Sequence, residues 1–152
     1  MRNYDRSQTS RAIATSADGG LTWSGVRHDP ALVEPICQAS LIGCTMPDGS
    51  LRLLFSNPAH TGKRLDMTVR MSNDEGKTWP VRRLITDDGP SRRVDGGGNT
   101  GTFTLSPTTA EPRGYLAATQ TPDGLIHLIT SKQHYMFNAS WIKSPMPAEK
   151  EK

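Results

Sequence analysis

The side chains most often used for metal and redox chemistry are few in this chain and stand far apart. There are two cysteines, Cys37 and Cys44, and four histidines, and no spacing among them matches a metal site. If "ICQASLIGC" is one extended strand, the two thiols lie roughly 23 Å apart at about 3.3 Å per residue, too far for a disulfide. We therefore expect two small, partly buried thiols and no metal.

The basic side chains form no continuous patch. The formal charge is +3 over 152 residues. The densest group is Arg82, Arg83, Arg92 and Arg93, with Asp87 and Asp88 between its two halves. This pattern does not favour a nucleic-acid partner, although it is compatible with small anionic ligands. No run of residues is long and apolar enough to span a membrane, so no membrane partner is expected.

Acidic and hydroxyl side chains recur in one short pattern. Residues 16–24, "SADGGLTWS", and 72–80, "SNDEGKTWP", both read Ser-x-Asp-x-Gly-x-Thr-Trp. Side chains of Ser and Asp accept backbone N–H bonds in tight turns, and Gly supplies a positive φ. We therefore interpret Asp18 and Asp74 as turn-forming rather than catalytic, with Trp23 and Trp79 covering the turns.

The segments around these turns are patterned as strands. "RAIATS" (11–16) and "LDMTVRMS" (65–72) lead into the two turns, and a Pro-Asp-Gly turn precedes a strand at 47–56 and again at 122–131. The chain is 34% hydrophobic, with 14 Gly and 11 Pro, a composition that suits short strands and tight turns. His127 and His134 fall on strand-patterned runs and are expected to be exposed or half-buried.

These segments predict an all-β fold, a partial β-propeller arc of about three blades. One unit spans 39–86, a second begins near 115, and the end of an earlier unit occupies 1–29. "QHYMFNASWI" (133–142) is expected to supply a late strand, and 87–113 a long loop with a short strand at "TFTL". We divide the chain into a propeller portion, 1–145, and a disordered tail, 146–152. The chain starts within a blade, so it is expected to be a portion of a larger propeller or a short relative of one.

The two Ser-x-Asp-x-Gly-x-Thr-Trp turns resemble the Asp boxes, or BNR repeats, of the bacterial exo-α-sialidase (neuraminidase) family. The resemblance extends in order through "RNYDRSQTSRAIATSADGGLTWS", "PICQASLI", "LLFSNPA" and "TVRMSNDEGKTWPVRRLI", covering residues 1 to about 86. It implies a six-bladed propeller in the parent family. It also implies three arginines that bind the substrate carboxylate, a Tyr nucleophile activated by a Glu, and an acid/base Asp, with no cofactor.

Carried over by position, the resemblance marks three residues of this chain. Arg2 and Arg70 look like the second and third arginines, and Tyr115, before a Pro-Asp-Gly turn, looks like the nucleophile. The simpler alternatives are a solvent-facing Arg70 and a packed strand Tyr115. The first arginine, the Asp and the activating Glu precede "RN" in the family, and Ser131 stands nearest the place of a later Glu. Glu111 is the local candidate for a base.

The resemblance implies release of terminal sialic acids through a Tyr-linked intermediate, with sialylated glycans or other anionic sugars as partners. The alternative is a sialidase-like module that binds anionic glycans, or is purely structural, without turnover. We expect the isolated chain to show no turnover. Residues 1–15 lack the apolar centre of a secretory leader. Members of the family are often secreted or periplasmic, so the location is left open, as is the oligomeric state.

Overall fold

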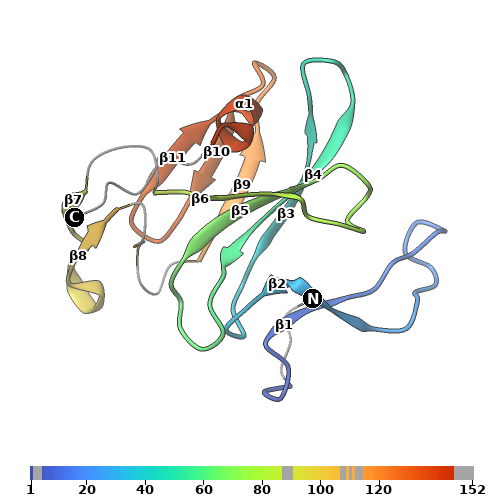
Figure 1. Ribbon diagram of the computed structural model, residues 1–152, viewed down its shortest axis with the longest axis horizontal. Coiled ribbons are helices and arrows are strands. Elements are labelled where there is room, and N and C mark those ends of the chain that lie inside the picture. The colour runs from blue at the N-terminus through green and yellow to red at the C-terminus, as the bar shows by residue number, and fades with distance from the viewer. Residues whose placement is uncertain (2–4, 87–90, 107–108, 110, 112–114, 146–152) are drawn as a thin grey trace.

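The computed structural model describes residues 1, 5–86, 91–106, 109, 111 and 115–145. Within them the chain forms eleven strands, one 3-10 turn and one short helix, and this helix is far too short to cross a membrane (Figure 1). The elements are β1 (Ser10–Ile13), β2 (Arg27–Val33), β3 (Ser40–Thr45), β4 (Leu51–Pro58), β5 (Met67–Ser72), β6 (Val81–Leu84), β7 (Arg92–Asp95), η1 (Gly98–Thr100), β8 (Thr102–Leu105), β9 (Ala117–Gln120), β10 (Ile126–Ile129), β11 (His134–Phe137) and α1 (Ala139–Lys143).

The centre of the fold is an antiparallel sheet in the order β3-β4-β5-β6. Side chains alternate between the two faces of a strand, so cross-strand partners define each face. Leu54 lies opposite Ile42 and Met71 on what we call the core face, and Phe55 lies opposite Arg70 on what we call the cleft face. All six residues of β5 are buried, because both faces of this strand are covered.

The core face packs against a second sheet, in the order β11-β10-β9, and against α1 (Figure 1). Two polar contacts join the inner strands, β3 and β9. The Gln120 amide accepts the Thr45 N–H at 2.7 Å and donates to the Thr45 carbonyl at 2.9 Å, and the Ala118 N–H donates to the Ser40 hydroxyl at 3.0 Å. The apolar core between the sheets is formed by Cys44, Met46, Leu54, Met67, Val69, Met71, Ile85, Leu116, Ile126, Leu128, Tyr135, Phe137 and Ile142.

The hairpin β1–β2 lies on the opposite side of the central sheet, next to the cleft face (Figure 1). The Asn57 amide of β4 donates to the Val33 carbonyl of β2 at 2.7 Å, and the Arg11 guanidinium lies 5.6 Å from the centre of the Phe55 ring. The strands β1 and β2 flank the first Asp box as β5 and β6 flank the second. Successive antiparallel sheets without closure confirm the predicted partial propeller arc.

The predicted strand "ICQASLIGC" is shorter in the structure. Strand β3 begins only at Ser40, and Ile36, at the start of the predicted segment, adopts a left-handed backbone conformation with φ of 56°. The assumption of one continuous strand was therefore wrong. Cys37 and Cys44 are not joined in a disulfide, and both are fully buried rather than partly buried as expected. Burial raises the pKa of the Cys44 thiol to about 11, which makes this group unreactive at neutral pH.

Two late segments also differ from the sequence prediction. The stretch 87–113 contains the predicted strand at "TFTL", which is β8, but also its partner β7, which the sequence did not indicate. In "QHYMFNASWI" only the first part is strand β11. The second part is α1, because the Asn138 side chain accepts the Trp141 N–H at 2.9 Å and starts a helical turn. The predicted tail 146–152 lies outside the described residues.

Both Asp boxes sit on hairpins between neighbouring strands, as predicted, and share one hydrogen-bond pattern. In the second box the Asp74 carboxylate accepts the Thr78 N–H at 2.8 Å, the Thr78 hydroxyl at 2.6 Å and the Ser72 hydroxyl at 2.7 Å. Asp18 makes the equivalent bonds to Thr22 and Ser16. The carboxylates are saturated by their own turns, which supports the structural interpretation.

These bonds predict an acid-resistant turn. Donation by the Thr78 hydroxyl, then by the Thr78 N–H and the Ser72 hydroxyl, lowers the pKa of Asp74 to about 2. A lowered folded-state pKa stabilises the fold above the unfolded value of about 3.9, and this contribution is lost as the pH falls through about 2. We expect the Asp74 carboxyl carbon to titrate by NMR with a midpoint near 2, and Thr78→Val to raise that midpoint. A wild-type midpoint near 4 would contradict the assignment.

Candidate functional site

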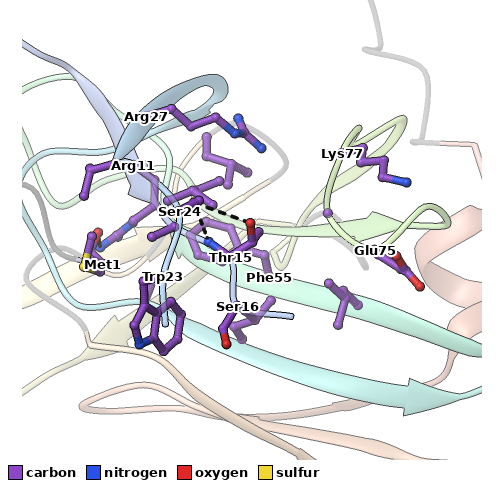
Figure 2. A pocket seen from close by; sticks show the side chains of 18 of the residues that line it. Met1, Arg11, Thr15, Ser16, Trp23, Ser24, Arg27, Phe55, Glu75 and Lys77 are labelled. Carbon is purple, nitrogen blue, oxygen red and sulfur yellow. Dashed lines mark hydrogen bonds between the residues drawn. The ribbon is translucent and has the colours of Figure 1, made fainter. Parts of the chain in front are cut away.

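A cleft of about 1640 Å³ lies between the hairpin β1–β2 and the cleft face. Its walls include Trp23 and Val26 from the hairpin side and Phe55 from the sheet, while Arg27 and Lys77 stand on opposite sides of it (Figure 2). Small-molecule sites usually measure about 300–1,000 Å³, so the cleft as a whole is larger than a sugar needs. The charged and hydroxyl side chains described below identify the parts of the cleft region that could bind a ligand.

The inner part of the cleft rests on a buried ion pair. The guanidinium of Arg11 in β1 lies 2.7 Å from the carboxylate of Glu34, and both side chains are almost fully buried. Arg11 also donates to the Cys37 carbonyl at 2.9 Å. Charges buried in this way are costly unless they are paired. The ion pair therefore joins the two ends of the β1–β2 hairpin, and the Arg11–Cys37 bond ties this hairpin to the segment that leads into β3.

The second buried arginine is Arg70 in the middle of β5, on the cleft face. Its guanidinium donates to the Asn57 amide oxygen at 3.2 Å, and the residue is only 4% exposed. Burial, together with the positive charge of the cross-strand neighbour Arg82, lowers the pKa of Arg70 to about 10, and the carboxylate of Asp29 opposes that change. Arg70 thus stays cationic at neutral pH but lies below the surface.

An accessible tyrosine that lines the cleft contacts an arginine from the central sheet. Tyr115 lines the cleft, is 40% exposed, and lies two residues before the first residue of the inner strand β9. Arg64 lies in the loop between β4 and β5, with its guanidinium carbon 4.8 Å from the centre of the Tyr115 ring. The antiparallel order of the strands explains this meeting, because the β4–β5 loop and the start of an inner strand fall at the same end of a blade.

A buried carboxylate, that of Glu111, and the backbone of Tyr115 are hydrogen-bonded to two adjacent residues. Glu111 is fully buried, and one of its oxygens accepts a hydrogen bond from the Thr130 hydroxyl. Its other oxygen has no hydrogen-bond partner among the described residues. The neighbouring Ser131 hydroxyl accepts the Tyr115 N–H at 3.4 Å. Residues 130–131 therefore connect the Glu111 carboxylate to the backbone that carries Tyr115.

The structure thus brings together only part of the set suggested by the sequence. Tyr115 lies at the cleft, Arg70 lies within the interior between the sheet and the hairpin, and Arg2 is outside the described residues. Sequence reasoning did not single out Arg64. The strand order could have indicated it. Arg64 lies in the loop that joins the second and third strands of one blade, and in a propeller this loop lies next to the start of the inner strand of the following blade.

Comparison with known proteins identifies the family of this chain. A model of the BNR repeat-like domain matches residues 1–128. The sialidase of Micromonospora viridifaciens is 33% identical over 137 residues, which are 87% of this chain and 18% of that protein. A sialidase of Bacteroides fragilis (strain YCH46) is 41% identical over 87 residues, which are 53% of this chain and 16% of that protein. This chain therefore spans less than a fifth of the length of either relative.

A solved structure agrees with the sequence relatives. The Hadza microbial sialidase Hz136 is similar over 91% of this chain and 24% of its own, with a TM-score of 0.59 and 27% identity. The chain belongs to the BNR repeat-like family and is a relative of the bacterial sialidases.

Proposed function

We propose that this chain provides the tyrosine side of a sialidase-type glycoside hydrolase site, acting on terminal sialic acids of glycoconjugates. The observation that carries the proposal is that Tyr115 lines the cleft and the Arg64 guanidinium lies 4.8 Å from its ring centre. A guanidinium binds a planar carboxylate through two parallel hydrogen bonds and stays charged at all relevant pH values. Sialic acids carry such a carboxylate next to the carbon that reacts.

In the proposed reaction the Tyr115 hydroxyl attacks the anomeric carbon of the sugar. The glycosidic bond breaks, the leaving oxygen takes a proton from an acid, and the phenol proton passes to a base. Water then cleaves the Tyr-linked sugar, and the configuration is retained. Arg64 would hold the carboxylate beside Tyr115 throughout. Glu111 is buried and does not face the cleft. It would help to position Tyr115 indirectly, through Thr130 and Ser131.

The role of Arg70 remains a prediction, and the geometry favours Arg64 for direct contact with substrate. The Arg70 guanidinium already bonds Asn57 and is only 4% exposed, whereas the Arg64 side chain is half-buried beside an exposed phenol. We therefore propose that Arg70 positions the sheet under the hairpin, and that Arg64 contacts the anion.

Binding tests this proposal directly in the isolated chain. We expect N-acetylneuraminate to bind with a Kd of about 1 mM or weaker, since one charge-assisted bidentate pair contributes about 1.5–3 kcal/mol. Arg64→Gln should weaken binding by at least about tenfold, because it removes that pair. The measurement is an NMR titration that follows the amides of Tyr115 and Ser131.

Two controls separate charge removal at the site from a general loss of charge. Arg52→Gln removes a half-buried arginine whose guanidinium bonds its own strand at the Leu51 carbonyl, so it should leave binding unchanged. The methyl ester of the sugar should bind as weakly to wild type as the free acid does to Arg64→Gln. Equal binding of the free acid to wild type and Arg64→Gln would refute the assignment. If Arg70→Gln weakened the binding of N-acetylneuraminate and Arg64→Gln did not, the sequence-based prediction that Arg70 binds the carboxylate would be favoured instead.

A further inference from the structure

Two histidines meet on the exposed face of the last sheet, away from the cleft. His127 of β10 and His134 of β11 lie diagonally across the hairpin, since His127 pairs with Met136 and Ile129 pairs with His134. The Nδ1 of His127 is 3.0 Å from the Nε2 of His134. The ring centres are 5.2 Å apart and the ring planes differ by only 12°, so the two nitrogens face each other nearly in one plane.

The backbone holds this pair in place before any ligand arrives. The turn between the strands is closed by the Thr130 N–H, which donates to the Gln133 carbonyl at 2.9 Å. The Thr130 hydroxyl accepts the Gln133 N–H at 3.0 Å and donates to the buried Glu111 carboxylate. The side chains on the other face of both strands, including Leu128 and Tyr135, are buried in the core. The hairpin is therefore a rigid platform for the two imidazoles.

We propose that His127 and His134 form a two-histidine chelate for a divalent transition-metal ion. Imidazole ligands bind such ions at about 2.0–2.1 Å. Two ligands at that length are about 2.9 Å apart when they subtend a right angle, and about 3.3 Å apart at a tetrahedral angle. The observed 3.0 Å is within the reach of one ion, but the two nitrogens now point at each other through a hydrogen bond. Both rings must turn about their Cβ–Cγ bonds for their lone pairs to converge at the right angle of tetragonal Cu²⁺ or Ni²⁺ sites.

The surroundings allow this role without a change in charge of the imidazoles. The two rings share one hydrogen bond, and moving the intervening proton to the far nitrogen of its own ring would leave both facing nitrogens free to ligate. The Asp123 carboxylate in the preceding turn interacts electrostatically with His127, which favours a cation nearby. Among the described residues no group of three metal-ligating side chains occurs, so water fills the other positions of the ion.

The linear sequence conceals this site. His127 and His134 do not match the spacing of known zinc motifs, and sequence analysis gave no metal site. Hairpin register, rather than spacing, brings them together, because residues diagonal across an antiparallel pair lie on the same face.

The experiment is isothermal titration of the whole chain with NiCl₂ in a buffer that does not bind metals. Wild type should bind one Ni²⁺. His127→Gln and His134→Gln should each weaken binding by about a hundredfold, because loss of one ligand abolishes the chelate gain. His28→Gln, a matched change in β2, should have no effect. As a second readout, Cu²⁺ bound to wild type should show two equatorial nitrogens by electron paramagnetic resonance.

A rescue variant makes the test specific to geometry. Met136 lies directly opposite His127, so Met136→His in the His134→Gln background should restore tight binding through a new cross-strand pair. The proposal is overturned if wild type binds Ni²⁺ no more tightly than either single variant, or if His28→Gln weakens binding as much. Circular dichroism of each variant checks the fold separately from metal binding; His134 is exposed and His127 is half-buried, so neither substitution removes a core side chain.

Discussion

Glu34→Gln is expected to lower the free energy of unfolding by about 3–5 kcal/mol, the usual effect of removing one partner of a buried ion pair. The Glu34 carboxylate lies 2.7 Å from the Arg11 guanidinium, and the side chains are 0% and 5% exposed. Glutamine keeps the shape but leaves the Arg11 charge without its counter-charge. Urea denaturation followed by circular dichroism measures the change.

Two controls test the electrostatic origin of this effect. Arg27→Gln breaks a contact with Asp29 at 3.6 Å in which the arginine is half exposed, so it should cost about 0–1 kcal/mol. The double substitution Arg11→Met with Glu34→Leu replaces the pair by apolar groups and should recover most of the loss. If the double variant is less stable than Glu34→Gln, the loss comes from shape rather than from an unpaired charge.

Leu128→Ala should destabilise the chain by about 2–5 kcal/mol, because it leaves a cavity between the two packed sheets. Leu128 is fully buried in the core, on the face of β10 that points toward the central sheet. Its neighbour in the same strand, Ile129, is 53% exposed on the other face and supplies the matched control.

The comparison of the two substitutions checks the strand register itself. Ile129→Ala should change the unfolding free energy by no more than about 0.5 kcal/mol, measured in the same denaturant series. Because a slip of one residue would exchange the two faces, comparable losses for both variants would show that β10 is registered differently in solution.

The sequence predicted the parts of the fold that depend on local chemistry. The Asp boxes could be recognised because Ser, Asp, Gly and Thr satisfy one another within a few residues, as the bonds of Asp74 show. The strands around them alternate and were found with the turns. The hairpin partner β7 was missed because its residues are mostly exposed and show no alternation.

The candidate site was harder to predict because it depends on contacts between distant segments. Tyr115 could be proposed from its place before a Pro-Asp-Gly turn, but the arginine beside it is Arg64, from a loop of the preceding sheet. Arg70 has the same residue type in a strand, and only the cross-strand register shows that its side chain lies under the hairpin. Similarly, the His127–His134 pair depends on register and not on sequence spacing.

The contact of Gln120 with β3 has a consequence for the precision of the site. Arg64 belongs to the central sheet and Tyr115 to the start of the last sheet, so their separation depends on how the two sheets are rotated about their common seam. The Gln120 amide imitates a peptide group and continues the hydrogen-bond ladder of β3 across that seam, with one bond accepted from and one donated to Thr45. A small rotation of one sheet against the other would lengthen both Gln120–Thr45 bonds at once. Gln120, at one end of the seam, therefore limits how far Arg64 and Tyr115 can move relative to each other at the other end.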